Sequence, residues 1–142
     1  MCNPVMTGSV ARRCLDIAPV RRFEDLIAWQ KARALTREVY RVTRSGPLAH
    51  DYDLTRQLRR ASISVMANIV EGFERSRRAE LLQFLSIANA SLRRTSFSSI
   101  RCPRRRLFAQ GQFDQLKRSA EEVARIIGGL RTSLAARGKR GR

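Results

Sequence analysis

The last third of the chain carries a heptad repeat of apolar residues, and this feature constrains the fold more than any other. Seven apolar residues are spaced alternately three and four positions apart: Phe113, Leu116, Ala120, Val123, Ile127, Leu130 and Leu134. An α-helix places such residues along one side, and three heptads suit antiparallel packing against other helices at about 20°. We therefore expect a helix over about 112–136, in which Gly128 and Gly129 permit close helix contact.

Three further segments have helical periodicity, and no useful length of chain alternates with the period of two that is typical of a strand. We expect helices over about 24–44, 53–72 and 77–100. Asp53 and Ser76 are the expected N-caps of the second and third of these helices, and Gly72 is the expected stop of the second. The sequence thus predicts an all-α four-helix bundle over 23–136, flanked by flexible basic tails at 1–22 and 137–142.

The second expected helix is apolar on two sides. Leu54, Leu58, Val65 and Ile69 form one stripe, whereas a second set lies on a different side. The second set comprises Ile63, Ala67 and Val70. A helix with two apolar sides needs two partners, and a bundle helix normally keeps one side in water. We expect copies of the chain to associate through the second set, the alternative being a central helix enclosed by its own chain.

Two polar residues interrupt this apolar stretch. Asn68 and Glu71 are three positions apart and so lie on one side of the helix. Glu71 also lies near a helix C-terminus, where the dipole disfavours a carboxylate, so we expect a cationic partner among Arg59, Arg60 and Arg75. The pair is interpreted as a polar contact that fixes helix register or a subunit joint, and a ligand contact is the alternative.

The formal net charge of +17 is concentrated in three segments. Residues 1–22, 93–106 and 137–142 carry +3, +6 and +4 of it. This layout is typical of chains that bind polyanions, although no aromatic interleaving accompanies the charge. Solvated tails and loops are the alternative. The candidate nucleic-acid-binding residues are Arg56, Arg59, Arg60, Arg75, Arg77, Arg78, Arg104, Arg105 and Arg106. For the first six, which lie in and after the second helix, ion pairing with Glu71, Glu74 and Glu80 is the alternative.

No constellation of catalytic or metal-binding residues is found in the sequence. His50 is the single histidine, and neither a Glu-x-x-His motif nor a glycine-rich phosphate loop occurs. The odd number of cysteines, Cys2, Cys14 and Cys102, argues against a disulfide framework and a zinc site. Without a membrane-spanning run or a secretory signal, we expect a cytoplasmic, non-enzymatic protein with no cofactor, metal or small-molecule substrate.

Several motifs resemble one bacterial family, the four-helix-bundle proteins called 23S ribosomal RNA intervening-sequence proteins. The resembling segments are Phe23–Ala32 (F-E-D-L-I-A-W-Q-K-A), Leu54–Ala61, Ala67–Gly72 and Phe84–Ala88 with Ser91-Leu92. The resemblance covers about 23–92 and resumes from Leu107 to Leu134. It implies an up-down four-helix bundle and a ring-like homo-oligomer, a pentamer in known relatives, some of which assist retroelement reverse transcriptases. It carries over no catalytic residues.

The segment 93–106, which is rich in arginine and contains Pro103, departs from the family pattern. A local reading-frame slip and a genuine basic insert that binds RNA are both consistent with it. Two further departures are mild: this chain has Val70 where the family has alanine, and Ala90 where the family has glycine. The sequence therefore predicts an RNA-associated oligomeric protein, and the alternative is a protein-interaction scaffold or adapter whose charge is incidental.

Overall fold

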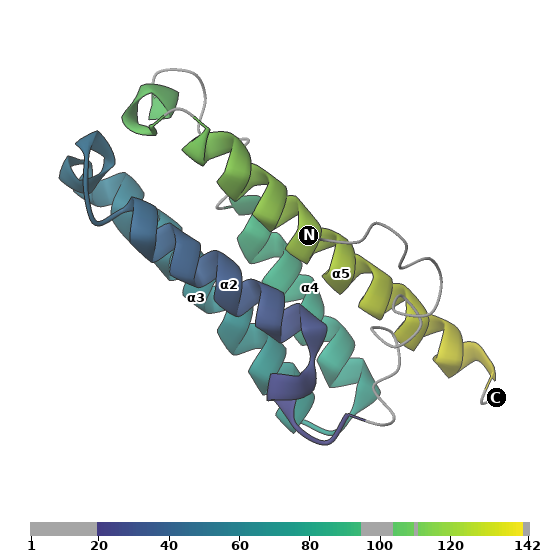
Figure 1. Ribbon diagram of the computed structural model, residues 1–142. Coiled ribbons are helices and arrows are strands. Elements are labelled where there is room, and N and C mark those ends of the chain that lie inside the picture. The colour runs from purple at the N-terminus through teal and green to yellow at the C-terminus, as the bar shows by residue number, and fades with distance from the viewer. Residues whose placement is uncertain (1–19, 95–103, 110, 141–142) are drawn as a thin grey trace.

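The computed structural model describes residues 20–94, 104–109 and 111–140, and within these ranges it contains four α-helices and no strand. The α-helices are α2 (Ile27–Val42), α3 (Tyr52–Glu74), α4 (Arg78–Arg94) and α5 (Gln112–Arg140). Three short 3-10 helices accompany them: η1 (Phe23–Asp25), η2 (Pro47–His50) and η3 (Arg104–Leu107). The long helices lie side by side (Figure 1), which confirms the prediction of an all-α bundle.

Contacts between α3 and α4 show that these neighbours run antiparallel. The hydroxyls of Ser64 and Ser91 lie 3.0 Å apart. Two turns further along α3, Gly72 lies against Phe84, which precedes Ser91 in α4. Progress along α3 therefore corresponds to backward progress along α4, as the up-down arrangement requires.

The first and last helices close the bundle through polar contacts. Lys31 of α2 forms an ion pair with Glu122 of α5 at 2.9 Å. About two turns further along α2, Glu38 accepts a hydrogen bond of 3.0 Å from Ser119 of α5. These pairs also run in opposite directions along the two helices, so α2 and α5 are antiparallel.

One apolar core lies between the four helices. The heptad residues of α5 are buried as predicted, except that Phe113 is half-buried and packs against the core. The largest fully buried side chains include Leu58, Ile69, Leu85 and Ile127, each from a stripe that the sequence indicates. Burying a side chain of this size contributes about 1.5–3 kcal/mol, so these stripes stabilise the bundle directly.

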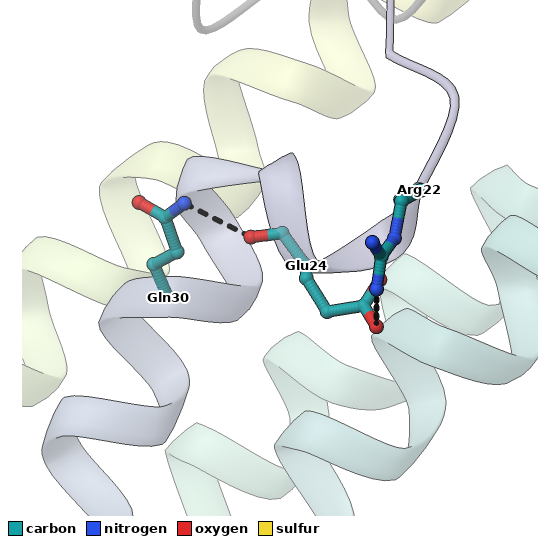
Figure 2. A network of polar contacts seen from close by, with 3 residues as sticks. All are labelled: Arg22, Glu24 and Gln30. Atoms are coloured by element: carbon teal, nitrogen blue, oxygen red, sulfur yellow. Dashed lines mark hydrogen bonds and ion pairs between the residues drawn. The ribbon is translucent and has the colours of Figure 1, made fainter.

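The chain enters the bundle through η1, which occupies the predicted start of the first helix. Arg22 donates to the Glu24 carboxylate at 3.0 Å, and the Gln30 amide donates to the Glu24 carbonyl at 2.9 Å (Figure 2). Leu26 has extended backbone angles, so the α-helix begins only at Ile27 rather than at about residue 24. Val20 packs against the core, which places the end of the predicted 1–22 extension within the folded unit.

The boundaries of α3 differ from the prediction at both ends. Asp51, not Asp53, is the N-cap, because its carboxylate accepts a 3.0 Å hydrogen bond from the Leu54 amide. Gly72 does not stop the helix, which continues to Glu74. Gly72 is buried instead: an added Cβ would lie 2.8 Å from the Phe84 Cβ, so the absent side chain lets α4 approach α3.

The ends of α4 and α5 also require correction. Ser76 does not cap α4, because the helix begins at Arg78. The φ of Ser76 is 57°, and the Ser76 hydroxyl donates to the Glu74 carbonyl at 3.4 Å. The predicted end of this helix near residue 100 lies outside the described residues. Helix α5 continues to Arg140, so residues 137–140 of the expected tail are helical.

Candidate nucleic-acid interface

The outward side of α3 carries two different surfaces. Five residues spaced four, seven, four and three positions apart lie on one side of the helix: Tyr52, Arg56, Ile63, Ala67 and Val70. This side points away from the core-facing stripe. Its N-terminal half carries aromatic and basic residues, and its C-terminal half carries aliphatic ones.

The N-terminal half contains a shallow pocket of about 290 Å³. It is lined by Tyr40, Tyr52, Thr55, Arg56, Arg59, Arg60 and Ile63. We call it the tyrosine–arginine pocket. None of its lining residues is acidic, and Arg56 and Arg60 are exposed with no ion pair to any described residue. The structure therefore brings three of the nine candidate arginines together at one concave, positively charged surface.

Arg59 has a structural task within this pocket. Its Nε donates to the Thr43 hydroxyl at 2.9 Å, and its Nη2 donates to the Thr43 carbonyl at 3.3 Å. The guanidinium also lies over the Tyr40 ring, 4.7 Å from its centroid. Thr43 follows the last residue of α2 and is buried, so Arg59 satisfies a carbonyl at the helix C-terminus that α2 itself leaves unpaired. The side chain is held in place while its charge borders the pocket.

The second group of candidate arginines lies at the opposite end of α3. Arg75 hydrogen-bonds Glu71 at 2.6 and 2.8 Å and lies 5.7 Å from the Phe84 ring centroid. The hydrogen bond to Glu71 raises the pKa of Arg75 above its ordinary value. At a rise of 1.5 Å per residue, Arg75 lies about 28 Å from Arg56 along the helix. The two groups therefore do not form one patch.

The remaining candidates are placed only in part. Arg77 and Arg78 are exposed and form no ion pair with any described residue, so the expected pairing with nearby glutamates holds for Arg75 alone. Arg106 is exposed in η3, which lies at the same end of the bundle as η2 (Figure 1). The side chains of Arg104 and Arg105 lie outside the described residues.

Asn68 and Glu71 do not act as one unit. The Asn68 amide donates to the Ser64 carbonyl at 2.7 Å and lies 3.1 Å from the Ser64 hydroxyl, which in turn meets Ser91 of α4. Glu71 pairs with Arg75 instead, and its side chain is 47% exposed. Asn68 thus belongs to a network that joins α3 to α4, whereas Glu71 belongs to an ion pair within α3.

The C-terminal half of the outward side presents aliphatic residues to solvent. Ile63, which also lines the edge of the tyrosine–arginine pocket, is 46% exposed, Ala67 is exposed and Val70 is half-buried. Ile87 of α4 is 42% exposed and lies one turn from both Phe84 and Ser91, which contact α3. Ile87 therefore belongs on the same flank of the bundle. In the sequence, Ile87 is one more apolar residue beside the buried Leu85 and Ala88 of α4, so spacing alone does not predict its exposure.

Sequence reasoning missed the aromatic part of the pocket. The expectation that no aromatic residue accompanies the arginines was wrong, because Tyr40 and Tyr52 line the same pocket as they do. The spacing of four between Tyr52, Arg56 and Arg60 is visible in the sequence and signals a shared helix face. The contribution of Tyr40 depends on the packing of α2 against α3 and has no such signal.

The sequence matches the model of the 23S rRNA-intervening sequence protein family over residues 24–129, well over half of the chain. The chain belongs to this family. The match to the 23S rRNA-intervening sequence proteins includes the whole outward side of α3 and extends on both sides of the unusual segment 93–106. The resemblance carried by the helix motifs is thereby confirmed. No curated protein matches the chain.

Two further properties concern the described part of this 23S rRNA-intervening sequence protein. Among those residues, no three histidine, cysteine, aspartate or glutamate side chains are grouped so that they could hold a metal ion. None of the helices described is both long and apolar enough to cross a membrane.

Proposed function

We propose that this 23S rRNA-intervening sequence protein is a non-enzymatic homo-oligomer that binds RNA. One observation carries the proposal: the outward side of α3 has an aliphatic half and a basic half, whose pocket is lined by no carboxylate and whose Arg56 and Arg60 form no ion pair with any described residue. The aliphatic half suits contact with another copy of the chain. The basic half suits the phosphates of RNA.

Self-association is supported by where the exposed aliphatic residues lie. Ile63 and Ile87 are the large aliphatic side chains that the described residues expose most, and both lie on the α3–α4 flank. Contiguous exposed apolar residues mark interaction surfaces more often than isolated ones do. A ring, and the pentamer known in relatives, is the form of assembly that the family resemblance favours.

RNA binding is supported by the electrostatics of the tyrosine–arginine pocket. Arg56, Arg59 and Arg60 bring three positive charges together, and none has a carboxylate within ion-pair distance among the described residues. Like charges held in one concavity repel one another, and a bound anion relieves the repulsion. A guanidinium group can bind two oxygens of one phosphate at once, so a phosphodiester backbone fits this pocket.

Light scattering after size-exclusion chromatography tests the assembly. Nuclease-treated wild-type protein is expected to elute as an oligomer at micromolar concentration. Ile63→Glu places a charge in the aliphatic half and should lower the subunit number, whereas Ala34→Glu at an exposed position of α2 should not. A monomeric wild-type protein would remove this half of the proposal.

RNA affinity as a function of salt tests the other half. Each phosphate contact to a single strand contributes about 0.7 to the slope of log K against log salt. Replacing Arg56 and Arg60 together by alanine should therefore reduce that slope by about 1.4. Replacing Arg118 and Arg125 together by alanine, at exposed positions of α5, removes the same charge and is the control. If the oligomer binds no RNA at low salt, a role as a protein-interaction scaffold replaces the one proposed.

A further inference from the structure

We infer that the tyrosine–arginine pocket takes single-stranded RNA, with one base stacked on Tyr52 and the adjoining phosphates on Arg56 and Arg60. This inference rests on the proposed RNA binding and specifies how the RNA is recognised. It assigns a role in recognition to a residue that charge alone does not single out.

Tyr52 is unusually available for such a contact. It is 75% exposed, the largest exposure among the large hydrophobic residues described. Its ring makes no aromatic or cation–π contact with any described residue, whereas the Tyr40 ring in the same pocket is covered by the Arg59 guanidinium. Tyr52 is also the first residue of α3, where the Asp51 cap fixes the backbone. A free aromatic face is thus held on a rigid element.

The spacing of the pocket residues matches an extended strand. Tyr52, Arg56 and Arg60 are four residues apart, so consecutive side chains are separated by about 6 Å along the helix axis. The line from Tyr52 to Arg60 is about 12 Å long, which is the reach of a few nucleotides. A strand that follows this line places a base on the ring and its backbone beside the two guanidinium groups. Arg59, held by Thr43, adds a third charge beside that path.

A duplex cannot use Tyr52 in this way. In a paired helix each base face is covered by its neighbours, and proteins contact the duplex through phosphates and 2′-hydroxyls in the wide minor groove. An unpaired base offers its face to an aromatic side chain, and such stacking tolerates any sequence. Arginines alone would accept either form of RNA, so the exposed ring is what favours the single strand.

Fluorescence anisotropy at low salt tests the inference with three labelled RNAs. These are a non-self-complementary 12-nucleotide strand, its duplex, and the same strand without bases. Tyr52→Ala should weaken binding of the strand by about 5- to 100-fold and leave duplex binding within about twofold. Tyr52→Phe keeps the ring and should behave like the wild type. The baseless strand should bind wild type and Tyr52→Ala equally, because it has nothing to stack.

Each contrary outcome has a distinct meaning. If Tyr52→Ala binds the strand as tightly as the wild type does, while the Arg56 and Arg60 alanine variant is weakened, the stacking inference is wrong and RNA binding stands. If Tyr52→Ala instead changes the subunit number by light scattering, Tyr52 belongs to the contact between copies and the inference is again overturned. If the wild type binds none of the three RNAs, both this inference and the proposed RNA binding fail.

Discussion

At the scale of single residues, two glycines with the same helical setting have opposite surroundings. An added Cβ at Gly72 would lie 2.8 Å from the Phe84 Cβ and 3.4 Å from the Leu81 Cα. An added Cβ at Gly128 would meet nothing within 4 Å, because this glycine lines an open groove between α4 and α5. Gly128 therefore does not serve the close helix contact expected from the sequence, whereas Gly72 does.

This contrast predicts stability changes of opposite sign. Gly72→Ala should lower the free energy of unfolding by about 1–3 kcal/mol, because α4 must shift to admit the methyl group. Gly128→Ala should raise it by about 0.5–1 kcal/mol, because alanine loses less backbone freedom on forming a helix. Guanidinium unfolding at one protein concentration compares the two variants. Equal effects would contradict the packing described for α3 and α4.

Two arginines of the pocket should differ in their effect on stability, because Arg59 has a structural role and Arg56 is proposed to bind RNA. Arg59→Ala removes the hydrogen bonds to Thr43 and should lower the free energy of unfolding by about 1.5–3 kcal/mol. Arg56→Ala removes no hydrogen bond or ion pair with any described residue and should change it by less than about 0.5 kcal/mol. Thermal unfolding measures both. A stable Arg59→Ala variant would show that the end of α2 does not need this guanidinium.

At the scale of elements, a surface ion pair between Arg22 and Glu24 lies at η1, where the chain enters the bundle ahead of α2. The hydrogen bond from Arg22, with a backbone hydrogen bond beside it, lowers the pKa of Glu24 below its ordinary value. A carboxyl group whose pKa is lower in the folded state stabilises the fold above its unfolded pKa, and the effect is lost as the pH falls through the folded pKa. The ion pair between Arg22 and Glu24 is thus strongest near neutral pH.

The corresponding prediction concerns the melting temperature as a function of pH. Glu24→Gln should melt below the wild type at neutral pH, and the difference should shrink below about pH 4, where the wild-type carboxyl is also neutral. Because both side chains are exposed, the difference should be small and should decrease with added salt. Differential scanning calorimetry provides the measurement. A constant difference across this range would exclude the ion pair as its cause.

The helices could be predicted from the sequence, but their ends could not. The apolar stripes determine which side of each helix is buried, and the heptad residues of α5 lie where that pattern placed them. The ends depend on three-dimensional contacts: Asp51 outcompetes Asp53 as a cap, and Gly72 is retained inside α3 by α4. In the pocket, the spacing of Tyr52 and Arg56 was visible, whereas the contact of Arg59 with Tyr40 and Thr43 requires the fold.

At the scale of the whole molecule, the proposed assembly couples stability to concentration. When only the folded oligomer buries the aliphatic half of α3, higher protein concentration favours the folded state. The melting temperature of the wild type should therefore rise over a hundredfold increase in concentration. That of Ile63→Glu should stay constant and lie lower at the upper end. Scanning fluorimetry across a dilution series detects the difference, and a wild-type curve without slope would contradict the assembly.

The two halves of the outward side share one rigid helix, and this has a consequence for the length of RNA that is bound. In a closed ring, the distance between neighbouring pockets would be set by the helices rather than by mobile linkers. A strand long enough to bridge two pockets would bind its second site at a high effective concentration, whereas a shorter one would gain nothing from the extra copies. Such a ring would bind long RNA strands more tightly than short ones, although its arginines do not distinguish one base from another.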